Sequence, residues 1–313
     1  MVNIQLSIED HDNLRNSRVV VVGVGTIGSR SAEALTKLGI GEIVLIDRDI
    51  VEEDNLDKQL LYNKTDVNQP KAIVSANTLN VNPDIKFENY VTDLNKDNVN
   101  LLKSDLVLDC TDNFETRFLI NDFCKKNNIP WIFSSASGKN GFVYTTKKNN
   151  PCFSCIFKES KELLENCDND NILNKTADEI SSLQVEEAVK SLIGRENTEE
   201  LMYLAGKITK IKVKKLDSCK ACNGEFKYLD KQIEMLIKKC KLGGAYEAYP
   251  QEKIDLNNVK DNFEIITLLP VLAVIKFENK IITIYKHGKI IIKDCETEEE
   301  ARKITEGVIL KLK

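Results

Sequence analysis

The strongest constraint on the fold is the segment from residue 18 to residue 47. An apolar stretch, Arg18–Val22, ends at the glycine loop Gly23-Val-Gly-Thr-Ile-Gly28, which opens a helical pattern. A second apolar stretch, 42–46, ends in Asp47, 19 residues after the last glycine of the loop. Continuous apolar runs are typical of strands that are buried on both faces of a parallel sheet. The segment therefore predicts a strand–helix–strand unit with a dinucleotide-type phosphate loop and an acidic ribose partner.

Further strands and helices are expected to alternate along the chain. This alternation predicts a doubly wound, Rossmann-like α/β fold with a mostly parallel sheet. The expected strands are 85–91, 105–109, 130–134 and 140–146, and the expected helices lie near 70–80 and 113–127.

The character of the sequence changes after residue 155. The stretch 156–179 is polar and is expected to form a mobile crossing loop, followed by a helix at 180–193. Beyond about residue 254 the pattern is rich in strands with local turns, and a helix is expected from Thr297. We expect a main domain over residues 1–250 and a small C-terminal ββα module over 251–313, whose role the sequence does not reveal. The other expected strands are 206–213, 225–229, 265–269, 271–277, 281–285 and 289–293.

Four cysteines form two CxxC pairs with 63 residues between them. Two short clips brought together supply four soft thiolates, the donor set of a structural zinc ion. Closure of each pair into a redox disulfide is the alternative. The sequence favours zinc, held by Cys152, Cys155, Cys219 and Cys222.

Composition excludes several classes of function. The 313 residues carry a net charge of −5 from well-mixed signs, which gives no support to a nucleic-acid surface. No apolar run approaches the roughly 20 residues of a membrane span, and the first ten residues lack a signal-peptide pattern, so a cytoplasmic protein is expected. With only two histidines, neither in a motif, a His-ligated metal or a Ser-His-Asp triad is nearly excluded.

An ordered series of motifs follows the glycine loop. It comprises Asp47-Arg-Asp49, Asn55-Leu-Asp-Lys-Gln59, Gln69-Pro-Lys71, Cys110-Thr-Asp-Asn113 and then the two CxxC pairs. Over roughly residues 17–224 this series resembles the ThiF/MoeB/HesA family, relatives of the ubiquitin-activating enzymes. The resemblance implies an ATP-dependent adenylyltransferase that activates the C-terminal glycine of a small ubiquitin-like sulfur carrier.

The resemblance also implies a role for each motif residue. ATP phosphates would lie on the glycine loop and Asp47 would hold the ribose, while Asp49 is either a second acidic contact or a surface charge. Asp112 would bind Mg²⁺, beside Asn113. The expected nucleotide-binding set is Gly23, Gly25, Gly28, Asp47, Asp49, Asn55, Lys58, Gln59, Lys71, Asp112 and Asn113.

Transfer of the adenylyl group from ATP to the carrier carboxylate would be catalysed by cations and by positioning of the reactants. The expected catalytic residues for this step are Lys58, Lys71 and Asp112. Each assignment has a plainer competitor. Asp47 would simply end a strand, Lys71 would be a solvated lysine in a first helical turn, and Asp112 would form a turn with its neighbour.

Two departures from the family pattern stand out. Lys58 replaces an arginine, which leaves a point charge in place of a bidentate fork. Residues 1–16 lack the family segment whose arginine reaches the partner subunit's ATP, and Arg15 is only a weak substitute. A nucleotide- and partner-binding protein with reduced turnover is therefore the alternative function. A NAD-dependent oxidoreductase is disfavoured, because no placed His or Tyr acid–base residue is evident.

Cys167 lies in the polar crossing loop, where ThiF-like enzymes carry the cysteine that bonds to the activated carrier or to sulfur. Its neighbours Glu165 and Asp168 would raise the pKa of the thiol, so a spectator cysteine is the alternative. The expected partners are a carrier with a Gly-Gly C-terminus and a sulfur donor, and the resemblance implies a homodimer.

Overall fold

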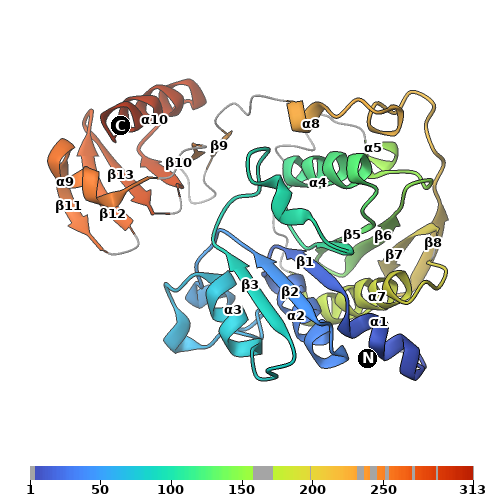
Figure 1. The fold of residues 1–313 in the computed structure, drawn as a ribbon. Helices are drawn as coiled ribbons and strands as arrows, with labels where there is room; N and C mark the ends of the chain where they lie inside the picture. Colours follow the sequence, from blue (N-terminus) through green and yellow to red (C-terminus); the bar gives the residue numbers. More distant parts are fainter. Residues whose placement is uncertain are drawn as a thin grey trace. The chain divides into compact units, whose positions relative to one another are not determined.

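The computed structural model describes residues 4–157, 172–197, 199–230, 236–239, 245–250, 254–269, 272–286 and 288–312. The chain divides into two compact units, residues 1–231 and 232–313, each described by itself (Figure 1). The division falls earlier than the expected boundary at 250/251. The reason is that the strand Ala245–Tyr249 pairs with the strand Ile290–Lys293 of the second unit.

The first unit is built on an eight-stranded sheet in the order β3-β2-β1-β4-β5-β6-β7-β8. The first five strands of this order are parallel, and β6, β7 and β8 continue the sheet in antiparallel pairing. The strands are β1 (Arg18–Val22), β2 (Glu42–Ile46), β3 (Lys86–Tyr90), β4 (Leu106–Asp109), β5 (Trp131–Ser137), β6 (Asn140–Thr146), β7 (Glu200–Ala205) and β8 (Ile208–Lys212).

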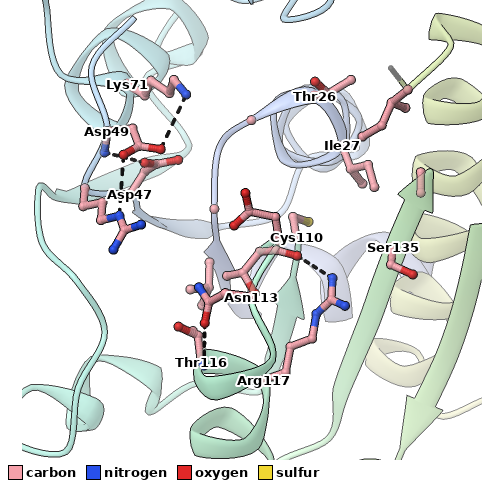
Figure 2. A pocket seen from close by; sticks show the side chains of 18 of the residues that line it. Thr26, Ile27, Asp47, Asp49, Lys71, Cys110, Asn113, Thr116, Arg117 and Ser135 are labelled. Carbon is pink, nitrogen blue, oxygen red and sulfur yellow. Dashed lines mark hydrogen bonds and ion pairs between the residues drawn. The ribbon is translucent and has the colours of Figure 1, made fainter. Parts of the chain in front are cut away.

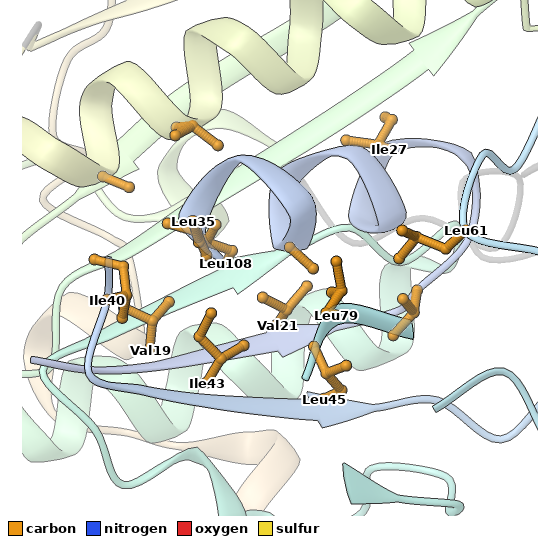
Figure 3. Packing of buried hydrophobic residues seen from close by; sticks show 14 of the residues in the cluster. Val19, Val21, Ile27, Leu35, Ile40, Ile43, Leu45, Leu61, Leu79 and Leu108 are labelled. Carbon is orange, nitrogen blue, oxygen red and sulfur yellow. The ribbon is translucent and has the colours of Figure 1, made fainter. Parts of the chain in front are cut away.

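Helices cover both faces of this sheet, which confirms the expected doubly wound fold. Successive residues of β1 belong to two different cores: Val19 and Val21 face one, and Val20 and Val22 face the other. Figure 3 shows the first core, in which Val19, Val21 and residues of β2 pack beneath α2. The helices are α1 (Ile8–Arg15), α2 (Thr26–Leu38), α3 (Lys71–Leu79), α4 (Phe114–Asn127), α5 (Phe153–Ile156), α7 (Asn174–Leu192) and α8 (Lys227–Asp230).

The structure corrects the sequence expectations in several places. Helix α7 begins at Asn174 and not at 180, so the end of the expected crossing loop is helical. Residues 225–229 do not form a strand, because they lead into the short helix α8, whose Tyr228 amide donates to the Asp122 carboxylate at 2.8 Å. Helix α1 and strand β7 were not predicted.

The second unit is a six-stranded antiparallel sheet in the order β11-β12-β13-β14-β10-β9. The helix expected from Thr297 is present as α10, and its Ala301, Ile304 and Val308 are buried in the core of this unit. The expected module is larger than ββα because two extra strands join its edge. Its elements are β9 (Leu236–Lys239), β10 (Ala245–Tyr249), α9 (Val259–Asn262), β11 (Glu264–Leu268), β12 (Leu272–Phe277), β13 (Lys280–Tyr285), β14 (Ile290–Lys293) and α10 (Glu298–Leu312).

Within the described ranges, none of the helices has the length and apolar character needed to cross a bilayer.

Candidate active site

A cavity of about 680 Å³ opens in the first unit where β1 and β4 end. These neighbouring strands are the point at which the chain order of the sheet reverses, and ligands of open α/β sheets bind at such switch points. Figure 2 shows side chains from several elements around it. Of the eleven expected nucleotide-binding residues, all but Gly28 line the cavity: Gly23, Gly25, Asp47, Asp49, Asn55, Lys58, Gln59, Lys71, Asp112 and Asn113.

Each of the three positions in the loop requires or favours glycine for a different physical reason. Gly23 has a φ of +84°, and a Cβ there would lie 2.9 Å from the Cys110 carbonyl oxygen. A Cβ on Gly28 would lie 1.9 Å from the Gly23 carbonyl oxygen, so this glycine serves packing and not the cavity wall. Gly25 has open space at its Cβ position, and no side chain of the described residues caps the N-terminus of α2 there. Backbone N–H groups of this turn can therefore meet an anion.

Asp47 is held by the loop that it faces. Its carboxylate accepts hydrogen bonds from the Val24 amide at 2.6 Å and the Asp49 amide at 2.7 Å. Burial, with the nearby Asp49 carboxylate, raises the pKa of Asp47 to about 6, although Lys71 opposes the shift. A ligand that donates hydrogen bonds to this carboxylate would favour its ionised form.

Lys71 is buried at the start of α3, with 7% of its surface exposed. Its Nζ atom lies 3.8 Å from Asp49 Oδ2, and its backbone amide donates to the Asp49 carbonyl at 2.9 Å (Figure 2). The alternative of a solvated lysine at position 71 is therefore wrong, because the fold buries this side chain. A buried ammonium at the positive end of a helix is costly unless an anion compensates it, and the cavity is where a phosphate would do so.

The loop after β4 presents Asp112. Beneath it, the buried Asp109 pairs with Arg117 at 3.2 Å and accepts hydrogen bonds from the Thr111 amide and hydroxyl. Burial raises the pKa of Asp109, and Arg117 opposes this effect. Arg117 also donates to the Thr111 carbonyl, so Thr111 is held on both sides. Asp112 itself is exposed and, among the described residues, makes no hydrogen bond or ion pair, which leaves its carboxylate available to a hard cation such as Mg²⁺.

Asn113 is engaged at the same loop in a local role. Its side chain caps α4 by accepting the Thr116 amide at 2.8 Å (Figure 2). In the loop 53–59, the Asn55 amide group donates to Glu52 at 2.9 Å. Gln59 is 5% exposed, and its side-chain oxygen accepts no hydrogen bond from the part of the chain that the structure describes, so a donor from a ligand would satisfy it.

Two cations of the cavity wall were missed from the sequence. Arg48 pairs with Asp93 at 2.7 Å, and Arg117 follows Asn113 by one helical turn. The position of Arg48 inside the motif Asp47-Arg-Asp49 was a usable signal. Arg15 is exposed and does not line the cavity. It ends α1 beside Gly41, at the amino end of β2 and so at the opposite end of the strands.

The four predicted zinc ligands lie together in the structure. Their Sγ atoms are all within 4.8 Å of one another, with neighbouring separations of 3.4 to 3.9 Å. A tetrahedral Zn²⁺ with bonds of about 2.3 Å places its sulfur ligands about 3.8 Å apart, so Cys152, Cys155, Cys219 and Cys222 fit zinc well.

The cysteine cluster is tied to α4, the helix that starts at the Asp112 loop. Asn121 accepts the Phe153 amide at 2.9 Å, next to Cys152, and Asp122 accepts the Tyr228 amide. Both anchoring side chains are buried. An ion in the cluster would therefore hold two distant chain segments against the helix, which is a structural contribution and not a chemical step. Cys167 lies outside the described residues.

Comparison with known proteins agrees with this geometry. The ThiF family profile matches residues 3–226. The SAMP-activating enzyme E1 of Haloferax volcanii is 35% identical over 190 residues, 59% of this chain and 70% of that protein. The sulfur carrier protein ThiS adenylyltransferase of Escherichia coli is 32% identical over 230 residues, 70% of this chain and 91% of that protein. The crystal structure of E. coli MccB with ATP covers 69% of this chain and 70% of its own, with a TM-score of 0.62 and 21% identity, which shows a shared fold.

The chain therefore belongs to the ThiF family, and the resemblance inferred from the sequence is confirmed. It is an adenylyltransferase of that family. The family match ends at residue 226, so it does not extend into the second unit.

Proposed function

We propose that this enzyme uses ATP and Mg²⁺ to adenylate the C-terminal glycine carboxylate of a small ubiquitin-like sulfur-carrier protein. The observation that carries the proposal is the convergence of ten expected nucleotide residues on one cavity at the switch point of the sheet. Sulfur-carrier and SAMP activation in the named relatives gives the substrate class.

In this proposal, backbone amides and cations would bind the phosphates, and a carboxylate would bind the ribose. The amides of the Gly25 turn would bind the phosphates, and Asp47 would accept hydrogen bonds from the ribose hydroxyls. When a carrier carboxylate oxygen bonds to the α-phosphorus, the bond from that phosphorus to the pyrophosphate oxygen breaks. Negative charge then grows on the α-phosphate and on the departing pyrophosphate. Lys58 and Lys71 would stabilise that charge, together with the Mg²⁺ ion that Asp112 would hold. The products are the carrier acyl-adenylate and pyrophosphate.

The reaction needs no protein nucleophile, so transfer after adenylation is a separate proposal. A thiol-sensitive adduct or a persulfide at Cys167, lost in Cys167→Ala, would support a transfer role that serves thiamine, molybdopterin or tRNA thiolation. Because adenylation needs only the nucleotide site and the carboxylate of the carrier, the same variant should retain pyrophosphate exchange. Full carrier thiolation by the variant would make Cys167 a bystander.

We further propose a homodimer, on the strength of the family resemblance, and a Zn²⁺ ion in the four-cysteine cluster. Since residues 1–16 lack the family segment whose arginine reaches the partner subunit's ATP, the two sites of the dimer should act independently. Mixing Lys71→Ala chains with wild type tests this: activity in proportion to intact subunits supports independent sites, and a dominant loss contradicts them.

The proposal as a whole is tested by exchange of pyrophosphate into ATP in the presence of a carrier. Exchange that requires the carrier and is lost in Asp112→Ala supports adenylation. Binding of NADH in place of ATP would favour an oxidoreductase, and ATP binding without exchange would favour a protein that has lost turnover.

A further inference from the structure

Arg30, in the second turn of α2, is a buried guanidinium that the motif series does not include. Its side chain is 5% exposed and donates to four acceptors. Nε contacts Asp178 Oδ1 at 2.6 Å, and Nη2 contacts Asn174 Oδ1 at 2.9 Å. Nη1 donates to the Thr26 carbonyl at 2.7 Å and to the Lys58 carbonyl at 2.5 Å. One side chain thus joins α2, the first turns of α7 and the loop that carries Lys58.

Asn174 completes a ring of hydrogen bonds with Arg30. Its Nδ2 donates to the Asp57 carbonyl at 3.0 Å, next to the Lys58 carbonyl that Arg30 holds. Two successive carbonyls of the loop are therefore fixed by donors from two helices that are far apart in sequence. The side chains of Lys58 and Gln59, at the end of this loop, line the nucleotide cavity.

The chemistry of lysine makes this backbone anchoring matter. Lys58 offers a point charge on a flexible stem and lacks the preorganised fork of an arginine, so its placement depends on the backbone below it. Displacement of a reacting or binding group by about 1 Å can cost roughly a hundredfold in rate. A guanidinium with four fixed acceptors is suited to hold that backbone, and an ammonium with three donors cannot reproduce its planar geometry.

We propose that Arg30 is a positioning residue that sets the backbone of Lys58, so that the Lys58 ammonium meets the β- and γ-phosphates of ATP. The inference rests on the proposed function, because it assumes that the cavity binds ATP. It adds a specific consequence: loss of the Arg30 side chain should weaken the binding of ATP but not the binding of AMP, because AMP lacks both of the phosphates that Lys58 would contact.

Calorimetric titration of the full chain with ATP–Mg²⁺ and separately with AMP tests the proposal. Arg30→Met should weaken ATP binding about tenfold and leave AMP binding unchanged, as should Lys58→Met. If Arg30 acts through Lys58, the double variant should bind ATP no more weakly than Lys58→Met alone, because the two effects are not additive. Arg30→Lys should restore only part of the loss. Lys37→Met, on the same helix but with a side chain 70% exposed, is the matched control and should bind both nucleotides normally.

Equal weakening of ATP and AMP by Arg30→Met would overturn the proposal and indicate a general structural role. An additive double variant would also overturn it. If Arg30→Met does not fold, Asn174→Ala removes the other donor of the ring without burying a lone charge, and it should show the same ATP-selective loss. Unchanged ATP binding in Asn174→Ala would contradict the inference. If the wild-type protein binds neither ATP nor AMP, both the proposed function and the inference about Arg30 are refuted.

Discussion

Two glycines of the phosphate loop, three residues apart, should respond to the same substitution in opposite ways. Gly28→Ala places a methyl group 1.9 Å from the Gly23 carbonyl oxygen, which is backbone and cannot rotate away. Gly25→Ala places a methyl group in open space at the cavity. The first change should damage the fold, and the second should damage only the binding of a phosphate.

The magnitudes follow from the contacts. Overpacking costs about 1–3 kcal/mol, and a contact this short belongs at the upper end for Gly28→Ala. For a unit of this size, each kcal/mol lowers Tm by about 2–4 °C, so a fall of roughly 6–12 °C is expected. Gly25→Ala should leave the Tm of the nucleotide-free protein nearly unchanged, since Gly25 has a negative φ that alanine tolerates. Its methyl group should weaken ATP binding by at least about tenfold, or 1.4 kcal/mol.

Thermal unfolding with and without ATP–Mg²⁺ measures both effects in one assay, because ligand binding to the native state raises Tm by mass action. Wild type should gain stability from ATP, and Gly25→Ala should gain far less from the same starting Tm. A Gly25→Ala protein that ATP stabilises as well as wild type would refute the assignment of this turn to the phosphates. A Gly28→Ala protein with unchanged Tm would refute the packing argument.

The remaining predictions concern charge and metal. Because the pKa of Asp47 is raised to about 6, about a tenth of this carboxyl is ionised at pH 5, and calorimetry should show adenosine binding roughly tenfold more weakly at pH 5 than at pH 7.5; Asp47→Asn should abolish the difference. Because this pKa is higher than in the unfolded chain, Asp47 binds more protons in the folded protein than in the unfolded one between about pH 4 and pH 6. The contribution of Asp47 to the free energy of unfolding therefore falls as pH rises through this range. Lys71→Met should weaken ATP binding, because it removes a cation from the phosphate site, and it should lower the Tm of the free protein only modestly, because its partner Asp49 is half exposed. Equal ATP affinity would contradict the phosphate role of Lys71. Elemental analysis should find one zinc per chain, and Cys219→Ser should lower Tm while ATP affinity is retained; reduced protein without metal would exclude the zinc site.

The sequence was informative wherever one local rule determined the structure. The apolar strands around the glycine loop and the acidic residue after β2 predicted the core of the sheet, because burial on both faces requires uninterrupted apolar runs. The two CxxC pairs predicted a cluster that the fold does bring together. In each case, residue type and spacing were sufficient.

The parts that were missed depend on contacts between distant segments. Strand β7 is a short, mostly apolar stretch that fits a buried helix segment as well as a strand, and its place is set by pairing with β6. The buried state of Lys71 arises from the packing of α3 beside β2 and from Asp49, which no local pattern predicts. Arg30 belongs to the same class, because its acceptors lie as far away as residue 178. The boundary at 231/232 depends on the pairing of β10 with β14, which joins segments about 45 residues apart.

The central claim is adenylation of a carrier, and its most direct test is isotope exchange between pyrophosphate and ATP. Small proteins of the source cell that end in Gly-Gly should be purified and assayed one by one with the enzyme and Mg²⁺. The account predicts that at least one of them supports exchange, that removal of its terminal glycine abolishes exchange, and that Asp112→Ala does the same in the enzyme. ATP binding by the enzyme, with no exchange in the presence of each and every one of these proteins, would contradict the claim.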